Sequence, residues 1–188
     1  MVKIKKNIVT KGWSGKLGDD IVFRRKGNKT YVALSPTKST KEPSEKQKAQ
    51  TQKFKLATLF AKTQNDDPVK KARYEAFATE YQSAFNLAIA DFLKAPEVKD
   101  VDVGNYSGTI GDLIKVVAID NFEVTEVKVQ IFDNGNNLIE SGLAVVNSLG
   151  TQWEYTCSIA NANPSGCKIL ATAKDYPGNI TELEIVIP

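Results

Sequence analysis

The spacing of apolar residues changes at Ala95-Pro96, and this change limits the folds open to the chain. Before it, long segments show the three- and four-residue spacing of helices; after it, short β-prone runs are separated by turn residues. Charge changes at the same place, because residues 1–95 hold 20 Lys and Arg against 9 Asp and Glu, whereas residues 96–188 hold 5 against 13. The pattern predicts an α+β multidomain protein, with a basic β-hairpin and helical domain over 1–95 and an acidic β-sandwich domain over 96–188.

The basic half begins with strand signals. Residues 2–9 predict a first strand, and the β-prone runs Ile21–Lys26 and Lys29–Leu34 flank Gly27-Asn28, which is a hairpin signal. The glycine-rich segment 12–18 lacks the spacing of a phosphate-binding loop and does not lead from a strand into a helix. We therefore do not interpret it as a nucleotide site.

Helix signals follow an extended linker at residues 35–43, which contains two prolines. Ser44 with Gln47 forms a capping box, and Asp67-Pro68 is an N-cap followed by proline at the first helical position. The last helical segment is apolar on nearly every side, so we expect it to be the most buried. Ser83 is the expected cap of the third helix. The expected helices run from Ser44 to about Gln64, from Pro68 to about Tyr81 and from Ala84 to Lys94.

Seven short β-prone runs in the acidic half predict an immunoglobulin-like β-sandwich. They cover residues 98–103, 113–119, 126–132, 137–145, 152–159, 168–173 and 181–187. Two of them alternate clearly, so we expect their apolar positions to point into the core. These positions are Val127, Val129 and Ile131 in one run, and Trp153, Tyr155, Cys157 and Ile159 in another.

Two segments of this half carry a resemblance to known modules. Residues 171–182 combine an alanine-x-aspartate, a turn with Gly-Asn and the start of a closing strand, and residues 117–129 form an earlier strand and turn. Both are similar to bacterial immunoglobulin-like modules. Such modules serve as spacers, adhesive units and assembly parts, so the resemblance implies a fold and no single function.

Further residues carry a resemblance that extends over the whole chain. They are Gly12, Ser14 to Asp19, Val22 to Arg24, Gly27, Pro36, Pro43 to Glu45, Gln47, Lys48, Lys53, Phe54, Asp67, Pro68, Tyr74 and the segment 83–93. With them the chain resembles an uncharacterised family of Bacteroidetes-type bacterial proteins. The resemblance implies that the two-part layout belongs to the family, and it implies no activity, cofactor or catalytic residue.

Composition argues against an enzyme. The chain has no histidine, the commonest general base and a common metal ligand, so we predict no catalytic residue and no cofactor. Cys157 and Cys167 flank a predicted turn. They either form a disulfide across a hairpin or fill the core as two small apolar side chains. Both lie in an apolar alternation without a visible basic activator, so a reactive thiol is not expected.

Several polar residues at predicted turns could bind calcium through oxygen atoms. They are Asp120, Glu123, Asp133, Asp175 and Asn179. Their spacing does not match the known calcium-binding loop, and Asp and Asn are ordinary turn residues. We therefore predict no metal site.

The strongest candidate for an interaction site is the basic hairpin, with Arg24, Arg25, Lys26, Lys29 and Tyr31. Cations beside an aromatic ring can bind phosphates and stack on bases, so a nucleic acid is one candidate partner. No apolar run is long enough for a membrane span, and no leader pattern precedes the first strand, so we expect a cytoplasmic protein, with signal-less export inside a particle as the alternative.

The contrast between a basic half and an acidic half favours contacts between copies of the chain. We therefore predict a non-enzymatic structural or assembly protein with a protein partner, forming a homo-oligomer or docking on a larger phage-like or filamentous complex. The alternative prediction is a nucleic-acid-associated protein that binds through its basic N-terminal half.

Overall fold

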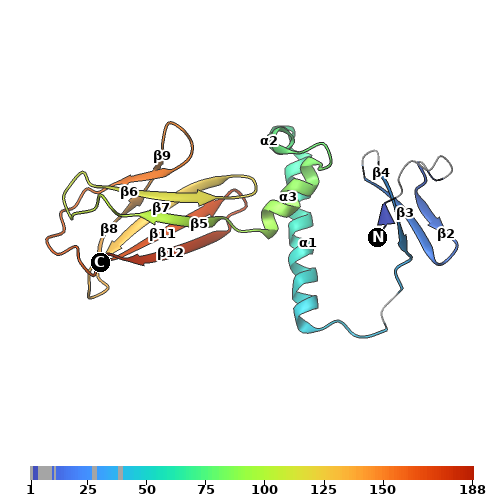
Figure 1. The fold of residues 1–188 in the computed structure, drawn as a ribbon, viewed down its shortest axis with the longest axis horizontal. Coiled ribbons are helices and arrows are strands. Elements are labelled where there is room, and N and C mark those ends of the chain that lie inside the picture. Colours follow the sequence, from blue (N-terminus) through green and yellow to red (C-terminus); the bar gives the residue numbers. More distant parts are fainter. Residues whose placement is uncertain (1, 4–9, 11, 27–28, 38–39) are drawn as a thin grey trace.

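The computed structural model describes residues 2, 3, 10, 12–26, 29–37 and 40–188 (Figure 1). These residues form three helices and three antiparallel sheets, a mixed α+β fold that confirms the predicted class. Figure 1 shows an N-terminal sheet, a helical segment and two packed sheets in order along the chain. Residues 35–37 and 40–43 of the predicted linker form no helix or strand and lie between the first sheet and the helices.

The N-terminal sheet has the strand order β1-β4-β3-β2. The predicted hairpin is confirmed, since Phe23 pairs with Val32 and Arg24 pairs with Tyr31 across β3 and β4. The predicted turn residues Gly27 and Asn28 lie outside the described residues, as do residues 4–9 of the predicted first strand. The strands are β1 (Val2–Lys3), β2 (Gly15–Leu17), β3 (Ile21–Lys26) and β4 (Lys29–Leu34).

Three helices follow, each starting at a predicted cap. Ser44 and Gln47 form the capping box, with the Gln47 amide N–H donating to Ser44 Oγ at 3.3 Å and the Ser44 amide N–H donating to Gln47 Oε1 at 2.9 Å. The second helix is shorter than predicted, because Ala78 takes an extended backbone conformation and ends it. The helices are α1 (Glu45–Asp66), α2 (Pro68–Phe77) and α3 (Ala84–Leu93).

The C-terminal sheets pack face to face around one core, and together they are called the sandwich below. Their strand orders are β5-β6-β10-β9 and β12-β11-β7-β8. Val127, Val129 and Ile131 point into the core, as their alternation predicted. The strands are β5 (Glu97–Asp102), β6 (Leu113–Ile119), β7 (Val124–Phe132), β8 (Leu138–Leu143), β9 (Val145–Val146), β10 (Trp153–Thr156), β11 (Lys168–Asp175) and β12 (Ile180–Val186).

Two strand predictions need correction. Ile159 was expected in the core but is 46% exposed, because β10 ends at Thr156 and the alternation ends with it. The predicted strand 137–145 is two strands, since β8 pairs with β7 whereas β9 pairs with β10 in the other sheet. Ala144 lies between them and donates its N–H to Val127 O at 2.8 Å, so the chain crosses from one sheet to the other at this residue.

The helices share a core with one end of the sandwich. Tyr74 on α2 stacks on Phe122 from the β6–β7 loop with ring centroids 4.2 Å apart, and Tyr176 from the β11–β12 loop packs edge-on against both rings. Buried residues of α1 and α3 complete this cluster. Among the described residues, none of the helices combines the length and apolar content needed to cross a membrane.

Candidate functional site

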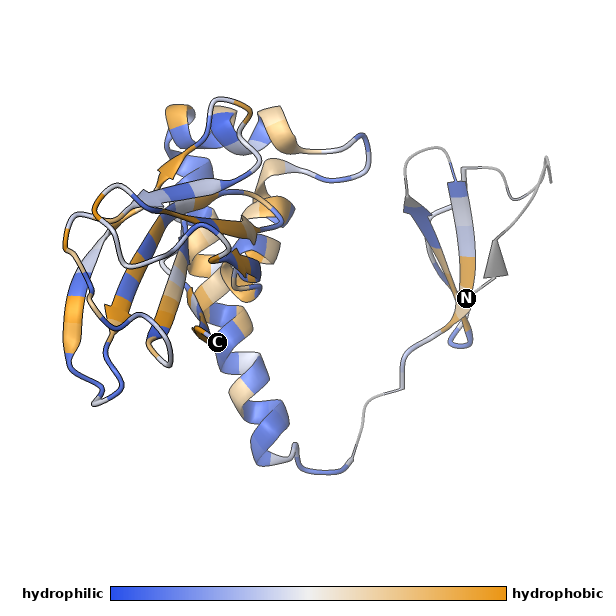
Figure 2. Cartoon of the chain, turned by 60° about the vertical axis from the view of Figure 1, so that its left-hand side comes forward, coloured by the Kyte–Doolittle hydropathy of each residue, from blue (hydrophilic) through white to orange (hydrophobic). Residues whose placement is uncertain are grey.

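Strand alternation gives the N-terminal sheet two different faces. Cross-strand partners lie on the same face, so Leu17, Ile21 and Leu34 share one face, and Phe23 and Val32 share it further along. The Trp13 ring contacts Phe23 edge-on at 5.2 Å. We call this the apolar face. Figure 2 shows that the hydrophobic stretches of this sheet lie toward the end of β4 that leads into the linker.

The opposite face carries Lys16, Val22, Arg24, Tyr31 and Ala33, and we call it the basic face. The hairpin therefore divides the predicted interaction residues. Arg24 and Tyr31 lie opposite each other on the basic face, whereas Arg25 pairs with Thr30 and lies on the apolar face.

The two remaining predicted interaction residues lie at the end of the hairpin. Lys26 pairs with Lys29, and Lys29 Nζ lies 5.7 Å from the centre of the Tyr81 ring. Sequence alternation could have separated Arg24 from Arg25, because neighbouring strand residues point to opposite faces.

Little of the chain covers the N-terminal sheet. Leu17 is 52% exposed and Leu34 is 83% exposed, and all three residues of β2 are exposed. Within the described residues, none of its strands makes more than isolated contacts with a helix or with the sandwich. A sheet with one apolar face normally buries that face against a second layer. Phe23 on this face is only 8% exposed, but neither the described helices nor the sandwich forms such a layer over Leu17 and Leu34.

The edge strand β12 presents a second exposed face of mixed character. Alternate residues point outward along it, with Ile180 and Val186 at the ends and Glu182 and Glu184 between them. Glu184 forms an ion pair with Lys168 at 3.5 Å, and among the described residues Glu182 forms none. This surface, the β12 face, combines apolar and acidic groups on a sheet edge.

A different site lies where the helices meet the sandwich. Asp91 comes from α3, Asp120 directly follows β6, and Asp175 ends β11. One carboxylate oxygen from each lies within 4.8 Å of the other two. Asp91 and Asp175 are buried and Asp120 is half-buried. Three segments far apart in the sequence thus place three carboxylates together, and we call them the carboxylate cluster.

Each of the three carboxylates accepts at least one hydrogen bond. The Tyr74 hydroxyl donates to Asp91 Oδ2 at 2.5 Å, and the Phe122 N–H donates to Asp120 Oδ2 at 3.3 Å. Asp175 accepts the N–H groups of Gly178 and Asn179 at its Oδ1 and the Asn179 side-chain amide at its Oδ2. By contrast, Oδ1 of Asp91 and Oδ1 of Asp120 are buried without a hydrogen-bond partner.

No lysine or arginine within the described part of the chain forms an ion pair with these three carboxylates. Burial raises the pKa of the Asp91 carboxyl to about 7; the Tyr74 hydrogen bond opposes this, and the nearby Asp120 and Asp175 add to it. Burial also raises the pKa of Asp175, against the hydrogen bonds from Asn179 and Gly178. Negative charge is therefore costly here unless a proton or a cation offsets it.

The remaining turn residues considered for calcium have other roles. Glu123 forms an ion pair with Arg73, whose guanidinium lies over the Tyr176 ring at 4.6 Å. Asn179 donates its amide to Asp175 Oδ2 at 2.6 Å and to the Phe92 carbonyl at 3.3 Å. Asn179 thus ties the end of α3 to the β11–β12 turn.

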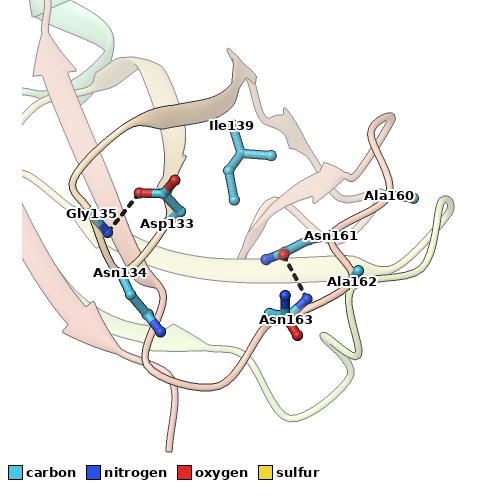
Figure 3. A pocket seen from close by; sticks show the side chains of 8 residues that line it. All are labelled: Asp133, Asn134, Gly135, Ile139, Ala160, Asn161, Ala162 and Asn163. Carbon is cyan, nitrogen blue, oxygen red and sulfur yellow. Dashed lines mark hydrogen bonds between the residues drawn. The ribbon is translucent and has the colours of Figure 1, made fainter.

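Asp133 borders a hollow of about 400 Å³ at the other end of the sandwich (Figure 3). Its Oδ1 accepts the N–H groups of Gly135 and Asn137, both at 2.8 Å, and its Oδ2 accepts the Asn137 side-chain amide at 3.0 Å. These bonds hold the pKa of Asp133 below its usual range. Asp133 is therefore a turn residue, and its oxygens are already used within the turn.

Both cysteines are buried free thiols in this structure. Burial, with help from Glu140, raises the pKa of Cys157 to about 12. The Cys167 thiol donates to the Asn163 carbonyl at 3.1 Å. A thiol with a raised pKa is a poor nucleophile, so this arrangement does not suit cysteine-based catalysis.

Sequence reasoning missed Asp91 as a member of the carboxylate cluster. Asp91 is the one ionisable residue in the sequence of α3, which is otherwise apolar on nearly all sides. A lone carboxylate in such a helix must face a partner when it is buried, and this signal was available from the sequence.

Comparison with known proteins adds little to this geometry. No protein-family model and no curated protein matches the chain. Among solved structures, it is similar to a crystal structure of an engineered protein, with a TM-score of 0.33 and 13% identity over 60% of this chain. The chain spans only 31% of that protein's length. A similarity this weak assigns no family and carries no argument about function.

Proposed function

We propose that this chain is a non-enzymatic assembly protein, in which the N-terminal sheet of one copy docks on the sandwich of a second copy. The docking surface is the apolar face of the sheet, which also carries Arg25. The β12 face of the neighbour is its target. The observation that carries the proposal is the exposure of Leu17 and Leu34 on the apolar face, where the described helices and sandwich make no more than isolated contacts with the sheet.

The two surfaces are complementary in chemistry. Leu17, Ile21 and Leu34 match Ile180 and Val186 as apolar groups. Arg25 on the docking surface matches the acidic centre of the β12 face, where Glu182 has no ion pair among the described residues. The halves of the chain that carry these surfaces also have opposite net charge, which favours the encounter of two copies.

The length of the linker is compatible with docking of the N-terminal sheet of one copy on a second copy. Residues 35–44 can extend over at most about 33–36 Å at the reach of an extended chain, so the sheet can move away from its own helices. A contact between two different surfaces of identical chains is heterologous, and it closes into a ring or continues as a filament. Both outcomes agree with an assembly role.

A charge swap tests the proposal. Sedimentation velocity over a range of protein concentrations, at ~50 mM and at higher salt, should show assemblies larger than one chain that weaken as salt increases. Arg25→Glu and Glu182→Arg should each weaken association about tenfold or more, and the double variant should recover most of the loss, because it restores an opposite-charge pair.

Arg24→Glu is the matched control, because it makes the same charge change in the same hairpin on the opposite face. It should leave association within about threefold of the original, since it changes only the long-range attraction. A single-chain mass at high concentration and low salt would contradict the proposal. Equal losses in the Arg24 and Arg25 variants would also contradict the assigned docking face.

The basic face supports a second candidate function, nucleic-acid binding. Arg24 and Tyr31 are cross-strand neighbours there, with Lys16 on the same face. A cation beside a half-buried aromatic ring can contact a phosphate and a base together. If this function holds, Arg24→Glu should abolish an electrophoretic shift of single-stranded nucleic acid at ~50 mM salt, and Arg25→Glu should reduce it much less. No shift by the unmodified chain would remove this candidate.

We also infer that the sandwich is immunoglobulin-like, as a rigid module that presents the β12 face. In that fold one sheet holds the first, second, fifth and fourth strands, and the other holds the third, sixth and seventh. With β8 counted as an additional strand beside the third, the orders β5-β6-β10-β9 and β12-β11-β7 agree with this arrangement. An experimental structure with a different strand order would overturn the inference.

A further inference from the structure

We propose that the carboxylate cluster of Asp91, Asp120 and Asp175 binds one divalent cation of the oxygen-preferring class at the junction of helices and sandwich. Hard cations such as Ca²⁺ and Mg²⁺ take carboxylate oxygens as ligands. One oxygen from each of the three residues lies within 4.8 Å of the others. Oxygens on opposite sides of a Ca²⁺ ion are separated by about the same distance, given bonds of roughly 2.3–2.6 Å.

The unpartnered oxygens are an independent sign of a ligand. Asp91 is fully buried, and its Oδ1 has no hydrogen-bond partner although Tyr74 satisfies Oδ2. Asp120 Oδ1 is also buried without a hydrogen-bond partner. Both side-chain amide atoms of the next residue, Asn121 Nδ2 and Oδ1, are buried and lack hydrogen-bond partners as well. Buried polar atoms in folded proteins nearly always have partners. A cation between the carboxylates would satisfy both Oδ1 atoms at once.

The charge of the cluster gives a second reason. Three buried or half-buried carboxylates have no lysine or arginine bound to them among the described residues. A shared proton between Asp91 and Asp120 is the competing explanation, and it neutralises only one of the three charges. A divalent cation neutralises two and also contacts Asp175.

Asp120 provides a route for the ion. It lines a hollow of about 510 Å³ with Phe77, Phe122 and Trp153, and this hollow opens between α2 and the first sheet of the sandwich. The three proposed ligands of the cation come from α3, from the residue after β6 and from the end of β11. A bound cation would therefore join the helical segment to both sheets, and its removal should loosen that junction.

Terbium luminescence is a direct test on the full chain after chelator treatment. Tb³⁺ takes the oxygen sites of Ca²⁺ and emits when an aromatic side chain within a few ångströms is excited. The Tyr74 hydroxyl is hydrogen-bonded to Asp91, so an ion in the cluster should be sensitised by this ring. We expect saturable emission that one of Ca²⁺, Mg²⁺ or Mn²⁺ displaces, and the order of displacement identifies the ion.

Variants separate the cluster from general surface binding. Asp120→Asn should weaken Tb³⁺ affinity tenfold or more, whereas Asp100→Asn, an exposed aspartate on β5, should leave it unchanged. The displacing ion should raise the thermal midpoint by about 5 °C at a hundredfold excess over its dissociation constant, and Asp120→Asn should abolish this rise.

Two results would overturn the proposal. One is an absence of displaceable emission, together with an Asp120→Asn variant that melts at a higher temperature than the original chain without metal. That combination identifies a shared proton, because removing one charge then relieves repulsion. The other is an equal loss of affinity in the Asp100→Asn and Asp120→Asn variants, which identifies non-specific binding to acidic residues.

Discussion

The sheets β1-β4-β3-β2 and β12-β11-β7-β8 are both four-stranded antiparallel ladders, yet their surroundings differ. The second sheet buries Val127, Val129, Ile169 and Ala171 against another sheet, whereas the first leaves Leu34 exposed. Local turn signals and alternation are sufficient to form either ladder. The difference teaches that a ladder gains most of its stability from a second layer, and among the described residues the N-terminal sheet packs on no such layer.

The largest expected effect comes from removing core volume in one sheet and comparing it with the other. Ile169 on β11 is fully buried, so Ile169→Ala should lower the free energy of unfolding of the sandwich by about 4 kcal/mol. Phe23→Ala in the N-terminal sheet should leave the free energy of unfolding of the sandwich within about 0.5 kcal/mol of the original, because the described residues of the two sheets make no more than isolated contacts.

The chain contains two tryptophans, and each reports on one region. Trp153 lies on β10, and Trp13 contacts Phe23. Urea unfolding of Trp13→Phe followed by fluorescence therefore measures the sandwich alone, and Trp153→Phe measures the N-terminal sheet. A large shift of the Trp153 transition in Phe23→Ala would show that the two regions unfold as one unit.

Local chemistry allowed much of the fold to be predicted from sequence. Caps at Ser44, Asp67 and Ser83 predicted the starts of all three described helices, because a cap is a contact between near neighbours. The split of 137–145 into two strands was not predictable in this way. It depends on Ala144 bonding to Val127, a contact that only the packing of two sheets creates.

Thiol reactivity should also differ between the sandwich, which holds Cys157, and the N-terminal sheet region, which holds Ser14. Because the pKa of Cys157 is raised to about 12, its thiolate fraction at pH 8 is about a thousandfold below that of an ordinary thiol. Iodoacetamide should therefore modify Cys157 at least a thousandfold more slowly than a cysteine introduced at Ser14, which is exposed in the N-terminal sheet region. Mass spectrometry of timed samples measures both rates, and denaturant should equalise them. Comparable rates in the native chain would contradict burial of this thiol.

The helices should unfold together with the sandwich, because they share a core with it. Phe122 stacks on Tyr74 and contacts Phe77 and Tyr176, so Phe122→Ala should lower the free energy of unfolding by about 3 kcal/mol. The helical signal in far-ultraviolet circular dichroism should shift together with the Trp153 transition. Phe54→Ala is the control, because Phe54 is 50% exposed on α1. Separate helix and sandwich transitions in the original chain would contradict the shared core.

The carboxylate cluster was only partly visible in the sequence. Asp120 and Asp175 are turn residues and could be named as oxygen ligands, but their partner Asp91 lies on a helix before the sandwich begins. Only the packing of α3 against the ends of β6 and β11 brings the three together. Periodicity predicts which residues are buried; it does not predict which distant segments meet.

The smallest expected effect compares two aspartates, the half-buried Asp112 of the sandwich and the exposed Asp19 of the N-terminal sheet. Asp112 Oδ2 accepts N–H groups from Ser107 at 2.6 Å and Thr109 at 2.9 Å, and these bonds hold its pKa below the usual range. A depressed folded-state pKa stabilises the fold above the unfolded pKa of about 3.9, and this stability is lost as pH falls through the folded value. Asp112→Asn should therefore lower the stability of the sandwich at pH 7, and its difference from the original chain should shrink below pH 4. Asp19→Asn should leave that stability unchanged, because Asp19 forms only an exposed ion pair with Lys16. Urea titrations at several pH values measure both differences. A loss in the Asp112 variant that stayed constant down to pH 2 would show that the aspartate acts through shape and not through its charge.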